Sequence, residues 1–409
     1  MKKNLISSYI TKGILLILNF IYIALFIQLL GVENYGLFTV SLSIVNLFLF
    51  FNTGIGLAVI KYFNDKNFDS QKVYETLISL SLFIVILFGI LQFIFSSYLL
   101  EENSDELKTI SYIITIFALM FALGILSSLL HAKEHIHEAN IVEVFFNFSK
   151  LIIGSLFIVF FSLDGAYMGM IVSLIISILY LIYYMKKFVK VDLKRFFYID
   201  LILLKDMIRF IWFNSLNEGI WRVFSNLDKI LISKLFGNEI LGYYNIAYTL
   251  VLRLWDFPDA ISRVVYPRFA KIKDNFIELN KVYKQMSLLN ISISLFVNSI
   301  VFIFAYDLIT LWLNEEVAQS SYWMLKILII GNILGTDNWV TTKVMLAWNN
   351  VNIMFRHNIA SLSLYFLSLV SFYFILEDVR AFLISFIVYY TSYMILNRKF
   401  VMTNIGRNL

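Results

Sequence analysis

Repeated apolar runs of about 20 residues decide what this chain can fold into, because a run of that length crosses the hydrocarbon core of a bilayer as a helix. Of the 409 residues, 60% are hydrophobic and 15% are charged. We therefore expect an all-α membrane protein with about twelve transmembrane helices. The predicted spans are 10–30, 37–60, 76–100, 109–130, 141–161, 166–185, 210–232, 243–265, 286–306, 321–347, 358–376 and 381–397.

The basic residues are distributed unevenly among the segments that connect these spans. Lys and Arg concentrate in alternate segments, starting with the N-terminal one, whereas the intervening connections are short and include Glu101, Glu102 and Glu315. The positive-inside rule then predicts cytoplasmic N- and C-termini. The net charge of +5 faces the anionic inner leaflet in this arrangement. We expect membrane lipids, and no nucleic acid, among the partners.

A short pattern occurs twice in the chain. Residues 31–36 and 237–242 both read G-x-E-x-x-G, at an offset of 206, and each copy follows the first span of its half. This match and the even number of spans predict parallel repeats, related by an axis along the membrane normal, with the substrate site between them. The predicted parts are an N-terminal lobe (1–185, six helices), a cytoplasmic interfacial linker (186–209), a C-terminal lobe (210–397, six helices) and a cytoplasmic tail (398–409).

The span that begins at Phe210 carries ionisable residues that a lipid-facing helix excludes. Glu218 and Arg222 are four residues apart, so they lie on one face of a helix, and Asn226 and Asp228 follow one turn later. An ionisable group at membrane depth costs about 2.5 to 3.5 kcal/mol. This face therefore predicts a hydrated interior cavity.

Other spans also carry charges at depth. Lys150 lies in the middle of the fifth span, and the eighth carries Arg253 and Asp256. Pro258 is expected to kink the eighth span, and the glycines before Asp337 predict locally broken structure in the tenth. Basic side chains outnumber carboxylates within the spans, so we expect a cationic cavity.

Several segments resemble the motifs of lipid-linked oligosaccharide flippases, the Wzx-type translocases of O-antigen and capsule repeat units. These segments are Leu30–Gly36, Asn52–Gly56, Asn226–Ile232, Phe236–Tyr244 and Tyr266–Arg268. The resemblance implies the multidrug, oligosaccharidyl-lipid and polysaccharide exporter superfamily, with two lobes that alternate access around a central cavity. It also implies a polyprenyl diphosphate carrier that bears a glycan. Asp228 and Gly242 match the motif directly, whereas no family motif fixes the other site residues.

The charges at depth form the predicted substrate site. Lys150, Arg222 and Arg253 are expected to bind phosphate or acidic sugars, since arginine binds phosphate through two parallel hydrogen bonds. Glu218 and Asp256 would balance them in the empty site. The alternative is that these residues are structural ion pairs.

Two further roles are predicted within the spans. Glu218, Asp256 and Asp337 are the candidates for ion coupling, and Asn226 and Asp228 complete the substrate-binding set. Trp221, Trp255 and Trp339 lie deep enough in their spans to stack against sugar rings, with core packing as the alternative.

The predicted function is the flipping of polyprenyl-diphosphate-linked oligosaccharide repeat units from the cytoplasmic to the outer leaflet of a bacterial cytoplasmic membrane. No Walker motif and no cysteine occur in the chain, and we expect neither an enzyme, nor a cofactor, nor a metal site. A polysaccharide polymerase and chain-length machinery are the expected protein partners. One alternative is a drug or cation antiporter of the same superfamily, which calls for an acidic cavity. The other is a membrane-embedded polymerase or glycosyltransferase, which calls for a large outer loop.

Overall fold

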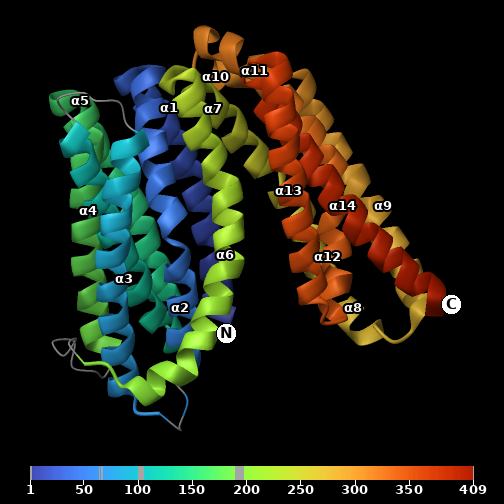
Figure 1. The fold of residues 1–409 in the computed structure, drawn as a ribbon, viewed down its shortest axis with the longest axis horizontal. Coiled ribbons are helices and arrows are strands. Elements are labelled where there is room, and N and C mark those ends of the chain that lie inside the picture. Colours follow the sequence, from blue (N-terminus) through green and yellow to red (C-terminus); the bar gives the residue numbers. More distant parts are fainter. Residues whose placement is uncertain (1, 64, 66–67, 100–105, 189–197, 409) are drawn as a thin grey trace. The chain divides into compact units, whose positions relative to one another are not determined.

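The computed structural model describes residues 2–63, 65, 68–99, 106–188 and 198–408, and these residues form helices and no strand (Figure 1). The first group of helices is α1 (Lys2–Phe48), α2 (Phe50–Tyr62), α3 (Ser70–Leu99), α4 (Glu106–Ala132), α5 (Ile136–Phe188) and α6 (Leu201–Phe236). The second is α7 (Asn238–Leu254), α8 (Asp256–Ile272), α9 (Phe276–Ile303), α10 (Ala305–Trp312), α11 (Glu315–Gly335), α12 (Asn338–Ala347), α13 (Val351–Leu376) and α14 (Arg380–Asn408).

The predicted fold class is confirmed. Gly31 interrupts α1 and Ser162 interrupts α5 with non-helical backbone angles, so each of these long elements contains two helices. Counted in this way, the described residues form twelve helical segments of membrane-spanning length, and α2, α8 and α12 each continue the preceding helix across a break. Seven of the helical stretches in this part of the chain are long and apolar enough to cross a membrane by themselves.

The chain divides into two compact units, Met1–Glu239 and Ile240–Leu409. Within the first unit, α6 runs alongside α1 and α2 (Figure 1). Helices α2 and α6 pack closely at Gly54, where an added Cβ atom would overlap Ser215 Oγ. The first helix expected for the C-terminal lobe therefore packs within the N-terminal unit, and the boundaries of the transport lobes stay a prediction.

The two copies of the repeated sequence pattern also have the same backbone conformation. Gly31 has φ 78° and ψ 164°, and Gly237 has φ 88° and ψ 167°, a conformation that is essentially restricted to glycine. After each glycine a helix runs to a single-residue break, at Leu49 between α1 and α2 and at Trp255 between α7 and α8. Both features recur at the offset of 206 that the sequence pattern gives.

The expected linker 186–209 is largely helical where it is described. Helix α5 continues to Phe188, residues 189–197 lie outside the described part of the chain, and α6 already begins at Leu201. The Asp200 side chain caps α6 by accepting hydrogen bonds from the backbone N–H groups of residues 202 and 203. Ser79 of α3 hydrogen-bonds both backbone groups of Tyr198 at 3.0 Å. These contacts fix the start of α6 against α3.

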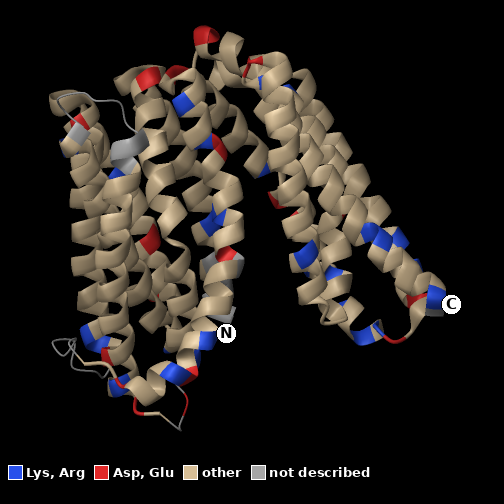
Figure 2. Cartoon of the chain, viewed as in Figure 1, with Lys and Arg blue, Asp and Glu red and all other residues tan. Residues whose placement is uncertain are grey.

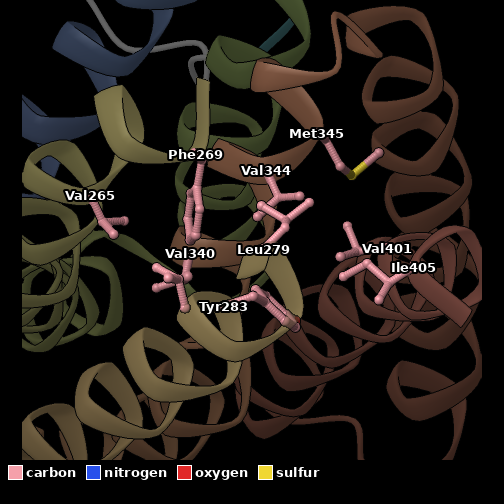
Figure 3. Close-up of a cluster of buried hydrophobic side chains, with 10 residues drawn as sticks. Val265, Phe269, Leu279, Tyr283, Val340, Val344, Met345, Val401 and Ile405 are labelled. Carbon is pink, nitrogen blue, oxygen red and sulfur yellow. The ribbon is translucent and has the colours of Figure 1, made fainter. Parts of the chain in front are cut away.

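The core of the C-terminal unit lies where α8, α9, α12 and α14 meet. Figure 3 shows Phe269 of α8, Leu279 of α9, Val344 of α12 and Ile405 of α14 in one buried apolar cluster. Tyr283 belongs to the same cluster and is 1% exposed. Its ring packs in the apolar core, and its hydroxyl reaches a buried polar network on the other side.

Charged residues avoid the middle of most helices. In Figure 2, the Lys and Arg segments of each unit gather toward the end that carries the α2–α3 or the α8–α9 turn. Lys61 lies in the last turn of α2 and Lys271 in the last turn of α8. The few ionisable residues that lie at depth are therefore the ones to examine for function.

Candidate functional site

Glu218 and Arg222 of α6 meet the end of α1. Arg222 Nε lies 3.1 Å from Glu218 Oε1, and both side chains are largely buried. An NH1 hydrogen of Arg222 is donated to the carbonyl oxygen of Asn46 at 3.1 Å. Carbonyls in the last turn of a helix have no partner in the next turn. The Asn46 carbonyl also accepts a hydrogen bond from the backbone N–H of Leu49 at 3.2 Å, so the guanidinium supplies a second donor at the break between α1 and α2.

Asn226 and Asp228 lie further along α6 and are buried. The side-chain amide of Asn226 donates to the carbonyl oxygen of Arg222 at 2.9 Å. Asp228 Oδ1 accepts a hydrogen bond from the backbone N–H of Lys229 at 2.7 Å. Both predicted substrate ligands thus bond to their own helix, and their role in binding substrate stays a prediction.

Lys150 of α5 is held against an aromatic ring. Its Nζ atom lies 4.0 Å from the centroid of Tyr22 and 5.8 Å from that of Phe146. Among the described residues, no carboxylate lies within ion-pair distance of this ammonium group. The face of the tyrosine ring stabilises the charge instead, and Lys150 shares no partner with Arg222.

An aromatic cluster that the sequence analysis missed surrounds the break at Leu49. Phe50 and Phe88 have ring centroids 5.6 Å apart, and the Phe51 and Trp212 centroids are 5.9 Å apart. Trp212 is 49% exposed. The adjacent phenylalanines at the start of α2 are the sequence signal from which this cluster could have been predicted.

Arg253 and Asp256 do not pair in the C-terminal unit. Arg253 lies in the last turn of α7, and its Nε atom is buried without a hydrogen-bond partner in the part of the chain that is described. Asp256 lies exposed at the start of α8, where the negative charge of a carboxylate interacts favourably with the helix dipole. The ion pair found nearby joins Asp259 to Arg263. The Arg253 side chain is thus half-buried, with one guanidinium donor, Nε, that makes no hydrogen bond among the described residues.

Asp337 occupies the predicted break in the tenth span, between α11 and α12. Its side chain is buried and accepts hydrogen bonds from the hydroxyls of Ser287 and Tyr283. Arg398 NH1 of α14 lies 3.2 Å from Asp337 Oδ2. The carboxylate therefore has both hydroxyl donors and a cationic partner.

A polar stripe on α9 continues this network. Its members are buried and recur every three or four residues along the helix: Ser287, Asn290, Ser294 and Asn298. Asn298 Oδ1 accepts a hydrogen bond from Asn332 of α11 at 2.8 Å. The spacing of these residues is visible in the sequence, but the sequence analysis did not use it and missed α9 as a partner of Asp337.

The three candidate sugar-stacking tryptophans have different surroundings. Trp221 is 39% exposed on α6, and Trp339 is half-buried in the first turn of α12. Trp255 is buried, and its ring centroid lies 5.1 Å from that of Tyr390 and 6.4 Å from that of Phe386. Of the three, Trp221 has the most accessible ring.

Comparison with known proteins gives a family and relatives that each match part of the chain. A family model described as "Polysaccharide biosynthesis protein" matches residues 1–273. The chain is 26% identical over 321 residues to the "Putative O-antigen transporter" of Shigella flexneri, with 74% of each chain covered. It is also 26% identical over 251 residues to the teichuronic acid biosynthesis protein TuaB of Bacillus subtilis, with 57% of this chain and 49% of that protein covered.

Solved structures show the same fold. The lipid II flippase MurJ, in an inward closed conformation, superposes with a TM-score of 0.73 at 14% identity, over 99% of this chain and 88% of that one. An inward-facing multidrug resistance MATE family transporter of the MOP superfamily gives 0.70 at 15% identity, over 97% and 94%. These likenesses establish the fold, and the family model covers more than half of the chain. The chain therefore belongs to the polysaccharide biosynthesis protein family.

Proposed function

We propose that this protein flips polyprenyl-diphosphate-linked oligosaccharide repeat units from the cytoplasmic to the outer leaflet of a bacterial cytoplasmic membrane by alternating access. The observation that carries the proposal is a set of half-buried cations, Lys150, Arg222 and Arg253, on helical segments of membrane-spanning length in a protein of a polysaccharide biosynthesis family. Relatives named for O-antigen transport and teichuronic acid biosynthesis, and a structural neighbour named for flipping lipid II, support a lipid-linked glycan as the substrate.

The three cations suit an anionic headgroup. Lys150 has only aromatic partners and the Arg253 Nε has no partner among the described residues, so both have hydrogen-bond donors available for phosphate or for an acidic sugar. Arg222 already pairs with Glu218. A phosphate would compete with that carboxylate for the guanidinium, which makes Arg222 the site where binding and ion coupling meet.

Membrane potential supplies a driving force. Moving one elementary charge through 100 mV is worth about 2.3 kcal/mol, so export of a diphosphate with two negative charges would gain on the order of 5 kcal/mol at an inside-negative potential of that size. Coupling to an ion through Glu218, Asp256 or Asp337 would add to this term. A polysaccharide polymerase and chain-length machinery are the proposed partners, since they would use the exported unit.

Flipping in reconstituted vesicles tests the proposal. The substrate is a fluorescent polyprenyl-diphosphate-linked oligosaccharide, and a potassium gradient with valinomycin sets the potential. We expect wild-type flipping to accelerate when the cytoplasmic face is negative. Lys150→Gln, Arg222→Gln and Arg253→Gln are each expected to slow it about tenfold or more, because a hydrogen bond to a charged group contributes about 1.5 to 3 kcal/mol.

The matched control is Arg380→Gln, which removes an arginine that pairs with Asp378 in an exposed turn. This variant should flip at the wild-type rate. Unchanged rates in all three variants of the half-buried cations, measured on protein that inserts and folds normally, would refute the cationic site. Absence of flipping by wild-type protein would refute the function itself.

A further inference from the structure

A groove lies between α3 and α4 in the N-terminal unit. Its volume is about 290 Å³, and its lining includes Leu82 of α3 and Ala118, Ala122 and Ile125 of α4. All of these residues lie in helical stretches that are long and apolar enough to span a membrane. The groove therefore lies between two helices that are suited to the hydrocarbon core of a bilayer.

The lining of the groove is suited to hydrocarbon. Two of the residues that line the groove, Tyr74 and Ser81, carry hydroxyl groups. The Ser81 hydroxyl donates to the carbonyl oxygen of Leu77 in its own helix at 2.6 Å. Burial of a polar group without a hydrogen bond is unfavourable, so a polar guest would gain little from this surface. Small side chains at positions 118 and 122 leave the space that the methyl branches of an isoprenoid chain need.

Apolar side chains extend from the groove toward the end of the unit where α2 leads into α3. A packed recess, without room for a water molecule, shares Tyr74, Ile78 and Ile125 with the groove, and Phe63, the residue after α2, forms part of the wall of that recess. Lys133 Nζ lies 4.8 Å from the centroid of the Phe63 ring. A cation thus lies beyond the packed apolar side chains at this end of the groove.

A second lysine strengthens the charge at this end. Lys61 Nζ lies 4.4 Å from the Phe210 ring centroid and has no carboxylate within ion-pair distance among the described residues. Two of the carboxylates in the first turns of α3 are engaged by Gln71: its side-chain amide donates to Glu75, and its backbone N–H donates to Asp69. An apolar groove that ends near lysines matches an anionic lipid with its phosphate at that end.

We propose that the α3–α4 groove binds the isoprenoid chain of the polyprenyl carrier, with the phosphate directed toward Lys61 and Lys133. This inference rests on the proposed function and names the place where the lipid part of the substrate binds. The groove holds a short part of the chain next to the phosphate, and the remainder lies in the bilayer.

Photolabelling of the full-length protein in vesicles tests the proposal. The probe is a polyprenyl diphosphate without a glycan that carries a diazirine in the isoprene units nearest the phosphate. We expect labelled peptides from 78–85 and 118–126, protection by unlabelled polyprenyl phosphate, and no protection by the same excess of phosphatidylglycerol. Labels confined to other helices, or equal protection by phosphatidylglycerol, would overturn the proposal.

Filling the groove gives an independent measurement. Ala122→Phe is expected to reduce labelling of these peptides about tenfold, because burial of the displaced hydrocarbon is lost. The matched control is Ala360→Phe on α13, at an exposed alanine outside the groove, and it should label like wild type. Labelling of wild-type protein without flipping would refute the proposed function and leave the lipid site standing, whereas flipping without labelling of α3 and α4 would refute the site alone.

Discussion

Arg222 on α6 donates a hydrogen bond to the main-chain oxygen of Asn46 at 3.1 Å, across 176 positions of sequence. The same guanidinium pairs with Glu218. A single side chain therefore joins a membrane-embedded carboxylate to the end of α1. Its removal should affect the stability of the N-terminal unit as well as transport.

Replacement of Arg222 by methionine should lower the free energy of unfolding by about 1 to 3 kcal/mol, because Glu218 loses its ionic partner. Adding Glu218→Leu to Arg222→Met should restore part of this loss, since the pair is then replaced by apolar groups. Thermal unfolding of the purified variants measures both effects. Strictly additive losses in the double variant would show that the two residues do not interact.

Gly54→Ala should destabilise the packing of α2 on α6. The new Cβ atom would lie 2.0 Å from Ser215 Oγ and 2.6 Å from the carbonyl oxygen of Ile211, and the second atom belongs to the backbone and cannot rotate away. Overpacking of this kind costs about 1 to 3 kcal/mol. The control is Gly13→Ala, where nothing lies within 4 Å, and the unfolding temperature of that variant should not fall.

Gly31→Ala and Gly237→Ala should be destabilising by similar amounts, about 1 to 3 kcal/mol, from backbone strain alone. Both positions have open space for a Cβ atom, so a clash contributes nothing. Asparagine should be no better than alanine, because ψ near 165° lies outside the left-handed helical region that asparagine tolerates. Unfolding temperatures of the four single variants test this, and rescue by asparagine at either site would contradict it.

Asp337→Asn should destabilise the C-terminal unit by about 1 to 3 kcal/mol, because Arg398 loses its counter-charge and the buried hydroxyls of Ser287 and Tyr283 lose a charged acceptor. The control is Asp378→Asn in an exposed turn, which should behave like wild type. Flipping under an imposed ion gradient then tests coupling. A variant that folds and still responds fully to the gradient would exclude Asp337 as the coupling residue.

The existence of the spans was predictable because a helix in lipid must satisfy all of its backbone hydrogen bonds internally. Their ends were less predictable. Helix α9 begins at Phe276, about ten residues before the predicted span, because Asn275 caps it outside the apolar run by accepting a hydrogen bond from Glu278 N. Asp200 caps α6 in the same way. Both capping residues are in the sequence, but apolar length alone does not detect them.

Some contacts of the candidate site were predictable from the sequence and others were not. The pairing of Glu218 with Arg222 follows from their spacing on one helix, and the break at Asp337 follows from the glycines before it. The Tyr22 ring beneath Lys150 and the Arg398 guanidinium beside Asp337 come from distant helices. Such partners depend on how the helices pack, which a single sequence does not specify.

The single-residue breaks at Leu49 and Trp255 give the two units one common change in the direction of the chain. The later copy carries Pro258 where the earlier one has Asn52, whose side chain donates to the carbonyl oxygen of Phe121 at 3.0 Å. Equivalent breaks in the two units are therefore surrounded by different side chains. The position of the break recurs, whereas the residues three positions after it do not.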